Sequence, residues 1–308
     1  MNNVQEPINK VAAIKEINAA TILWTADCSP DGKYCAIGGD DGILRIYEAT
    51  KFKLLKTHKF INAVQCLDWN KNGKQLAIAL DDKPVELFNI ETGQFQKLQQ
   101  TTGSRALAWN HDGSMLATGD YNGLLYIWTK EGKLLKTIKK EDTKTYLTVD
   151  WHPKKNVILT GSDKIRLFDT SANLLKSIKH RPEETIILTV KWHPSGSFFA
   201  TGDYGHKEEG IESLLQFWKG DGTLIKSFSG SKAEYRNIRW NKDGSLLATA
   251  SDALRLWSKD GRIVYTGKSD ALLWGVDWNK QDENIVSSSA NGKISIWTSK
   301  ALFIRAVL

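Results

Sequence analysis

The 308-residue sequence predicts an all-β fold made of seven similar four-stranded antiparallel units. A phrase of about forty residues recurs seven times, and such a period indicates stacked supersecondary units instead of one irregular core. Asp-Gly and Asn-Gly dipeptides follow short apolar runs at regular places, as expected for hairpins. An aromatic residue closes the third run of every unit. The repetition therefore favours a single domain.

The first strand of each unit ends at a marker residue that precedes a turn. In the second unit, for example, the apolar run 64–69 is followed by Asn72-Gly73. An apolar run followed by such a turn is typical of a strand that begins a hairpin. The seven markers, which are separated by 41, 40, 42, 41, 48 and 38 residues, are Cys28, Trp69, Trp109, Trp151, Trp192, Trp240 and Trp278.

The second and third strands follow the marker at similar distances in each unit. The third strands end at Tyr47, Phe88, Trp128, Phe168, Trp218, Trp257 and Trp297. The fourth strands are rich in lysine, as in 51–56 and 133–140. We expect them at exposed sheet edges, where charge discourages aggregation. Four such strands cannot bury both faces alone, so the units must stack, with the large aromatic residues between them.

These repeats resemble those of the WD40-repeat family, whose fold is a β-propeller, here with seven blades. The resemblance extends from about residue 10 to the end. The family's Gly-His dipeptide is absent and its closing Trp-Asp survives only as Phe168-Asp169, so we expect aromatic packing to replace most of the family's His-Ser/Thr-Asp-Trp hydrogen-bond network. We predict a flexible arm at 1–9 and one propeller at 10–308, with blades at about 20–58, 61–99, 103–139, 144–180, 185–229, 233–267 and 271–308.

Two segments compete to close the ring. In this family the N-terminal strand commonly supplies the outermost strand of the last blade. Residues 10–18 are the candidate here, because 14–17 match 135–138 in pattern. Residues 304–307 stand at the spacing of a fourth strand and offer an alternative. We favour the N-terminal segment.

The resemblance also implies a binding surface at the mouth of the central channel. We call the face from which the first strands start the top face. Members of the family commonly bind peptides there, through the residue four positions before each marker. Trp and Arg are the residue types enriched at binding hot spots, which predicts a pocket for an acidic or aromatic-bearing peptide; the alternative is that the tryptophans only fill the channel. The seven residues are Trp24, Gln65, Arg105, Leu147, Leu188, Arg236 and Trp274.

A second candidate surface is the insertion at 204–213, between the second and third strands of the fifth unit. Long loops on rigid scaffolds often carry recognition, so Tyr204 and His206 are candidate contact residues. Tyr121, in the equivalent link of the third unit, would extend the same surface. The alternative is an ordinary solvated loop.

The net charge of +7 and the isoelectric point of about 9.1 favour acidic partners. Nucleic acid or another polyanion is the alternative partner, although only nine of the 42 basic residues are arginine and lysine is typical of solvated surfaces. No apolar run reaches the roughly 20 residues of a membrane helix. The polar start lacks the pattern of a secretory signal, which predicts a cytoplasmic protein.

The sequence contains no motif of an enzyme, a metal site or a cofactor site. The six histidines lack ligand spacing, and the glycines form no Gly-rich phosphate loop. Cys28, Cys35 and Cys66 form no CxxC pair, and we predict that they are small buried apolar residues without a disulfide. The sequence therefore predicts a non-catalytic protein-interaction scaffold. A module of a larger assembly is a further alternative, and the oligomeric state stays open.

Overall fold

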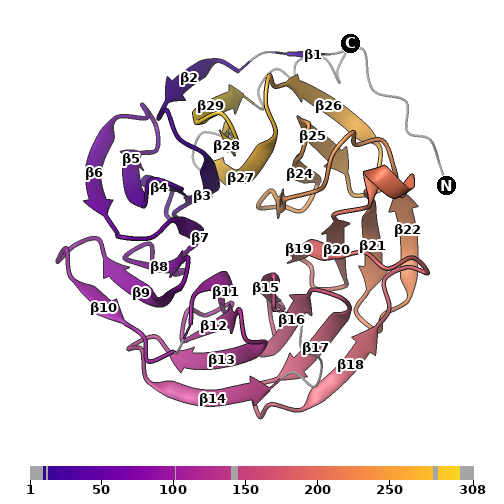
Figure 1. Ribbon diagram of the computed structural model, residues 1–308, viewed down its shortest axis with the longest axis horizontal. Helices are drawn as coiled ribbons and strands as arrows, with labels where there is room; N and C mark the ends of the chain where they lie inside the picture. Colours follow the sequence, from indigo (N-terminus) through magenta and orange to yellow (C-terminus); the bar gives the residue numbers. More distant parts are fainter. Residues whose placement is uncertain (1–9, 12, 101, 140–144, 280–283, 299–308) are drawn as a thin grey trace.

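The computed structural model describes residues 10–11, 13–100, 102–139, 145–279 and 284–298. Seven antiparallel sheets surround a central opening like the blades of a propeller (Figure 1). The predicted all-β fold with seven blades is confirmed. Within the described ranges the single helical element is a 3-10 turn, η1 (Lys207–Glu209).

Each blade runs from an innermost first strand to an outermost fourth strand. Blade one contains β3 (Leu23–Cys28), β4 (Tyr34–Gly39), β5 (Ile43–Glu48) and β6 (Leu54–Lys59). Blade two contains β7 (Val64–Trp69), β8 (Gln75–Leu80), β9 (Lys83–Asn89) and β10 (Phe95–Lys97). Blade three contains β11 (Ser104–Trp109), β12 (Met115–Asp120), β13 (Leu124–Thr129) and β14 (Leu134–Lys139). Blade four contains β15 (Thr148–Trp151), β16 (Val157–Gly161), β17 (Ile165–Asp169) and β18 (Leu174–Ile178).

The remaining three blades repeat this plan. Blade five contains β19 (Ile187–Trp192), β20 (Phe198–Asp203), β21 (Leu215–Lys219) and β22 (Leu224–Phe228). Blade six contains β23 (Asn237–Trp240), β24 (Leu246–Ala250), β25 (Ala253–Ser258) and β26 (Ile263–Lys268). Blade seven contains β27 (Leu273–Asn279), β28 (Asn284–Ser289) and β29 (Lys293–Thr298).

The N-terminal segment joins two blades. β2 (Lys15–Asn18) pairs antiparallel with β29 and forms the outermost strand of blade seven. β1 (Lys10–Val11) pairs in parallel with β26 and adds a fifth strand to blade six. The candidate closing segment 10–18 is thus split between two sheets. The arm at 1–9 and the rival strand at 304–307 lie outside the described residues.

The apolar core lies between the blades. One buried cluster joins Leu44 and Ile46 of blade one to Leu67, Trp69 and Leu76 of blade two, and similar clusters follow around the ring. Each cluster combines residues from neighbouring blades because a single four-stranded sheet has no partner for either face. The stacking inferred from the repeat is therefore the source of the core.

Part of the family's hydrogen-bond network is retained, more than the sequence suggested. The indole N–H of the third-strand tryptophan donates to a hydroxyl on the second strand in four blades. These bonds are Trp128 to Thr118 at 2.9 Å, Trp218 to Thr201 at 3.1 Å, Trp257 to Thr249 at 3.1 Å and Trp297 to Ser287 at 2.9 Å. Since the tryptophan and the hydroxyl lie on paired strands of one blade, this half of the network forms without the missing Gly-His dipeptide.

The expectation of three unpaired cysteines is wrong for two of them. Cys28 and Cys35 are direct partners in the β3–β4 ladder, with Cα atoms 4.0 Å apart, and their sulfur atoms form a disulfide of 2.07 Å. The hairpin register brings together two residues that the sequence separates by a turn. Cys66 remains a free thiol, and burial raises its pKa to about 11, so it is protonated and unreactive at neutral pH.

Candidate functional site

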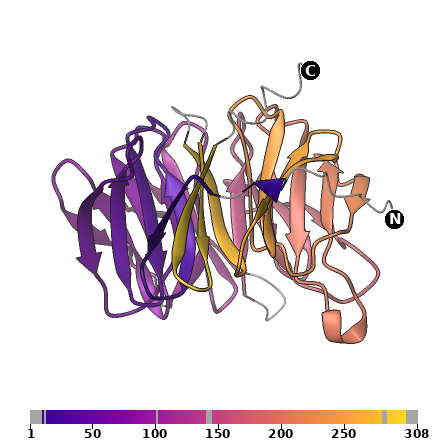
Figure 2. The same ribbon diagram turned by 90° about the horizontal axis from the view of Figure 1, so that it is seen from above.

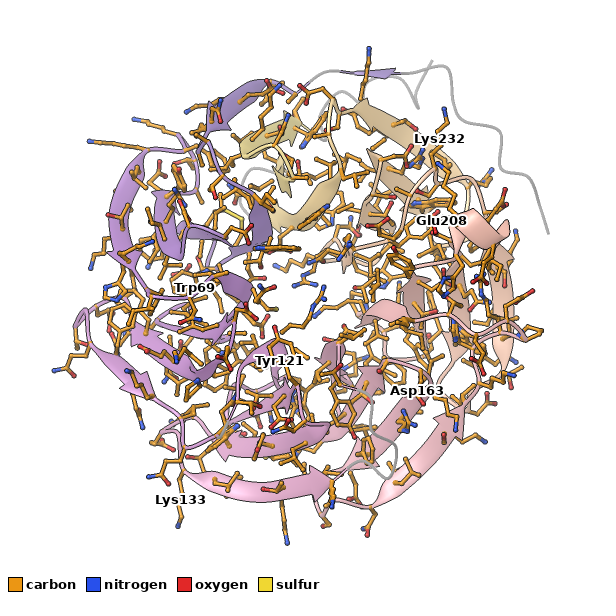
Figure 3. The ribbon with its side chains drawn as sticks, in the orientation of Figure 1. Trp69, Tyr121, Lys133, Asp163, Glu208 and Lys232 are labelled. Carbon is orange, nitrogen blue, oxygen red and sulfur yellow. A yellow bond between two sulfur atoms is a disulfide. The ribbon has the colours of Figure 1, made fainter. Side chains whose placement is uncertain are left out.

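The seven residues four positions before the markers meet at one end of the central channel. Each occupies the same place on the innermost strand of its blade or just before it, so the ring symmetry brings them together. They are partly exposed and line one cavity of about 70 Å³. Figure 3 shows nitrogen-bearing side chains reaching into the central opening. We call this set the channel mouth: Trp24, Gln65, Arg105, Leu147, Leu188, Arg236 and Trp274.

Two tryptophans form one side of the channel mouth. The ring centroids of Trp24 and Trp274 lie 3.9 Å apart with a tilt of 39°, across the junction of blades one and seven. The indole N–H of Trp24 donates to the carboxylate of Asp40. The indole N–H of Trp274 has no acceptor among the residues described. That N–H is buried, so the pair offers an aromatic surface and not a further donor.

Arg236 is held against this aromatic pair. Its guanidinium lies 4.8 Å from the ring centroid of Trp274 and donates to Glu234 at 2.8 and 2.9 Å. A cation over an aromatic face is attracted by the ring quadrupole. The seven mouth positions contain no acidic residue, but the neighbouring Glu234 neutralises one of the two arginines.

Arg105 differs because it has no counter-ion. In the part of the chain that is described, no residue accepts a hydrogen bond from its guanidinium or forms an ion pair with it. Burial, and then the positive charge of Arg236, lower the pKa of Arg105. A guanidinium in this setting is stabilised by any anion that approaches it. Arg105 is therefore the residue of the channel mouth that is most prepared for an acidic ligand.

Tyr121 lies at the inner end of blade three (Figure 3), close enough to Arg105 for that charge to act on its ionisation. Its hydroxyl donates to Asp81 at 3.0 Å. Burial and the Asp81 carboxylate raise the pKa of Tyr121, so the phenol stays neutral. The bond ties the top link of blade three to that of blade two and borders the channel mouth without lining its cavity.

Tyr204 and His206 lie elsewhere. Their rings are 5.8 Å apart within the insertion, and neither residue lines the channel mouth. The insertion carries η1, which lies away from the central opening and projects beyond the strand ends in the edge-on view (Figure 2). We therefore treat the insertion as a separate surface.

Buried polar groups hold the insertion in place. One oxygen of the Asp203 carboxylate accepts the backbone N–H groups of Gly205 at 3.1 Å and Leu214 at 2.8 Å. The guanidinium of Arg181 donates to the carbonyl of Glu212 at 2.9 Å. Asp203 and Arg181 are 1% and 7% exposed, so the loop stands on a fixed base.

A layer of charged residues, which the sequence analysis missed, lies deeper in the channel. It contains the residues that directly precede the markers in six blades: Asp27, Asp68, Asp150, Lys191, Arg239 and Asp277. The sequence carried a signal, since Asp stands before the marker in four of the seven repeats. Its role was hidden because each partner belongs to another blade.

In this charged layer, carboxylates join neighbouring blades. Asp27, Asp68, Asp150 and Asp277 each accept the backbone N–H of the next blade's marker, at 2.7 to 2.8 Å. Arg239 lies 3.7 Å from Asp27 and 3.8 Å from Asp277, so it connects blade six to both sides of the ring closure. Lys191 pairs with Asp150 at 2.6 Å. The charged layer is thus internally paired.

Crowding of these carboxylates shifts their ionisation. Burial, and then the charges of Asp277 and Asp68, raise the pKa of Asp27 well above its usual value. Burial also raises the pKa of Asp68. Burial alone would lower the pKa of Arg239, but the surrounding carboxylates raise it, so Arg239 stays charged. The positive charge of Arg239 offsets the repulsion between these neighbouring carboxylates in the channel.

The histidines that precede prolines in the sequence serve as links between blades. His152 donates from Nε2 to the carbonyl of Gly196 at 3.1 Å, and His193 donates to that of Gly244 at 2.9 Å. Burial lowers the pKa of both imidazoles, which favours the neutral form that this bonding uses. No group of three or more potential metal ligands occurs within the described ranges. In the same ranges, no helix is long and apolar enough to cross a membrane.

Comparisons with known proteins agree with this architecture. A model of the family "Eukaryotic translation initiation factor eIF2A" matches residues 62–164. The chain is also 26% identical over 206 residues to the transcriptional corepressor LEUNIG_HOMOLOG of Arabidopsis thaliana, covering 64% of this chain and 25% of that protein. It is 27% identical over 158 residues to the WD repeat-containing protein slp1 of Schizosaccharomyces pombe, covering 49% and 32%.

A third relative is the mouse F-box-like/WD repeat-containing protein TBL1X, 30% identical over 144 residues, or 46% of this chain and 26% of that protein. The alignments thus span only a quarter to a third of these three relatives. None of these descriptions is that of an enzyme. The model "WD domain, G-beta repeat" matches residues 14–48, 173–214, 222–263 and 261–298, which together make up half of the chain. With seven blades in the structure, this chain belongs to the WD40-repeat family.

Proposed function

We propose that this protein is a non-catalytic interaction scaffold that binds a peptide or a partner domain on the top face of the propeller, at the channel mouth. The observation that carries the proposal is that Arg105 and the Trp24 and Trp274 pair line the same cavity. Within the described residues, no group accepts a hydrogen bond from the Arg105 guanidinium, whose pKa is lowered by burial and by Arg236. An uncompensated arginine that shares a cavity with two tryptophans is typical of a binding hot spot.

The chemistry of the channel mouth defines the partner. A carboxylate would satisfy the Arg105 guanidinium, and an aromatic or aliphatic side chain beside it would cover the tryptophan pair. We therefore propose a partner segment that carries an acidic group, an aromatic group or both. Tyr121 borders this surface, whereas Tyr204 and His206 would contact only a partner that extends to blade five.

The relatives support the class of function only. The printed name of one relative describes a transcriptional corepressor and that of another an F-box-like protein. The alignments cover at most a third of the three relatives named above, so neither activity is assigned to this chain. We propose a cytoplasmic location as a separate matter. The Cys28–Cys35 disulfide counts against this location, because structural disulfides are rare in the cytoplasm. Fractionation of native cells decides the matter, and recovery of the chain outside the cytoplasmic fraction would contradict the proposal.

The test is a quantitative pull-down from the native cell with the purified chain as bait. We expect the double variant Trp24→Ala with Trp274→Ala to lose at least about tenfold in partner recovery, as is usual for a central aromatic hot spot. Leu174→Ala, on the exposed outer strand β18, is the control. Unchanged recovery with the double variant, at unchanged melting temperature, would contradict the proposed site.

The positive charge favours one other class of partner, nucleic acid. The exposed lysines are spread over the outer strands, for example Lys56, Lys136 and Lys176 on three different blades. Distributed charge of this kind lacks the concentrated face of most nucleic-acid-binding proteins. We expect no mobility shift of DNA or RNA at about 50 mM salt, where phosphate contacts are strongest.

A further inference from the structure

A second cavity, larger than the one at the channel mouth, lies at the outer junction of blades one and two. Its volume is about 260 Å³. β6 of blade one and the turn and outer strand of blade two border it, and these elements are neighbours in Figure 1. We call it the junction pocket, and its lining residues are Leu44, Ile46, Lys56, Thr57, His58, Phe88, Gly93 and Phe95.

The junction pocket is open because the repeat is broken there. At two other junctions an apolar side chain on the outer strand packs against the third turn of the next blade. Ile178 lies against Gly222, and Phe228 lies against Gly261. The equivalent residue of blade one is the exposed His58, which pairs with Leu44 as Phe228 pairs with Leu215. The space beside Gly93 is therefore empty. No atom lies within 4 Å of the position that a Cβ atom would occupy on this residue.

The walls of the junction pocket are aromatic. The His58 and Phe95 rings stack with centroids 4.1 Å apart, and the Phe88 and Phe95 rings stack at 4.5 Å. The edge of the pocket is basic, since Lys56 lies at 6.0 Å from the Phe88 ring and donates to the carbonyl of Ile90 at 3.1 Å. No acidic residue is among the lining residues. The pocket thus combines aromatic walls with a positive edge.

We propose that the junction pocket binds an aromatic side chain of a partner protein, carried next to an acidic residue. Its volume of about 260 Å³ lies near the lower end of the roughly 300 to 1,000 Å³ of small-molecule sites and suits a single side chain. Aromatic rings gain from edge and offset contacts with aromatic walls. A carboxylate beside the ring complements Lys56. This contact is independent of the channel mouth.

The probe is the capped peptide acetyl-Ala-Trp-Asp-Ala-amide, titrated into the full chain and followed by ligand-observed NMR. We expect saturable binding in the roughly millimolar range, as for other ligands with a single small anchor. Replacement of Trp by Leu in the peptide should weaken binding at least about fivefold because the aromatic contacts are lost. Replacement of Asp by Asn should weaken it about threefold.

Matched variants of the protein locate the site. His58→Ile introduces the residue that blades three and four carry at this position, Ile138 and Ile178, and should fill the pocket. We expect it to weaken binding more than tenfold while the melting temperature stays the same or rises. Lys56→Ala should abolish the preference for Asp over Asn, whereas Lys136→Ala, at the equivalent position of blade three, should change nothing.

Several results would overturn the proposal. Binding that is absent, non-saturable or equally strong for the Leu peptide would contradict an aromatic pocket. Wild-type affinity in a folded His58→Ile variant would place the peptide elsewhere. If His58→Ile fails to fold, the Lys56→Ala variant alone tests the site. Lys56 is exposed, so its replacement should not disturb the fold. Unchanged binding by the Trp24→Ala, Trp274→Ala variant is required, so failure here and failure at the channel mouth are distinguishable.

Discussion

The channel mouth and the charged layer lie three residues apart along the inner side of the blades, yet they differ in how their charges are paired. In the charged layer, Arg239 lies between Asp27 and Asp277, and the carboxylates bind backbone N–H groups of the next blade. In the channel mouth, Arg105 has no partner among the described residues. One layer satisfies its charges internally and holds the ring together. The other leaves the charge of Arg105 uncompensated, as a binding surface for an acidic ligand requires.

The largest expected effect breaks the charged layer. Arg239→Gln removes the cation between Asp27 and Asp277 and leaves buried carboxylates uncompensated, so we expect a loss of about 3 kcal/mol in the free energy of unfolding. Urea denaturation measures it. Arg236→Gln, three residues away at the channel mouth, is the matched control and should cost less than about 1 kcal/mol. Equal losses for the two variants would contradict the distinction between the layers.

A second change tests how far blade one depends on its covalent link. The backbone N–H of Cys28 donates to Asp277, so the disulfide supports the strand on which the charged layer closes. We expect Cys28→Ala with Cys35→Ala to lower the free energy of unfolding by about 2 kcal/mol. Cys66→Ala is the control, since that thiol is free. If the free energy of unfolding falls only in the Cys66→Ala control and not in the double variant, the disulfide does not stabilise the fold.

The pH dependence sharpens the comparison. Burial and neighbouring carboxylates raise the pKa of Asp27, and burial raises that of Asp68, so the folded state binds protons more strongly than the unfolded chain. The stabilisation that this provides is present at low pH and is lost as pH rises through the folded-state pKa values. We expect the penalty of Arg239→Gln to be larger at pH 8 than at pH 5. Thermal unfolding of both proteins at both pH values measures this loss of stability. A loss that is the same at pH 5 and pH 8 would contradict repulsion between the buried carboxylates.

The smallest expected effect on stability is that of Arg105→Gln. The substitution removes a charge that lacks a counter-ion and is repelled by Arg236, so the free energy of unfolding should change by less than about 0.5 kcal/mol. Recovery of an acidic partner should nevertheless fall. Thermal unfolding and a pull-down from the same preparation separate the two quantities. A large loss of stability would assign Arg105 to the structural group.

Much of this architecture could be predicted because it is repetitive. The marker spacing predicted seven blades, and the resemblance to the WD40-repeat family implied that the residue four before each marker faces the channel mouth. In the structure these seven residues line one cavity, in which Trp24 contacts Trp274. The two tryptophans are 250 residues apart in the sequence. They meet because ring closure makes blades one and seven neighbours, and a repeat count is enough to infer that.

Other features depend on partners that the repeat does not specify. The recurring Asp before the marker is visible in the sequence, but its acceptor role depends on the neighbouring blade. The Cys28–Cys35 disulfide depends on the hairpin register, and the division of the N-terminal segment between blades six and seven depends on which sheet edges are free. The junction pocket exists because His58 replaces an apolar residue where the next blade has only Gly93.

The sequence by itself determined the number of blades, the antiparallel order within each blade and the ring of residues around the channel, because strand periodicity and turn chemistry are local properties that repetition amplifies. Only the tertiary structure decided which of those residues are satisfied and which are left without partners. Pairing of a buried charge or the filling of a gap between blades depends on atoms from distant segments, and their positions follow from the packing of the whole ring.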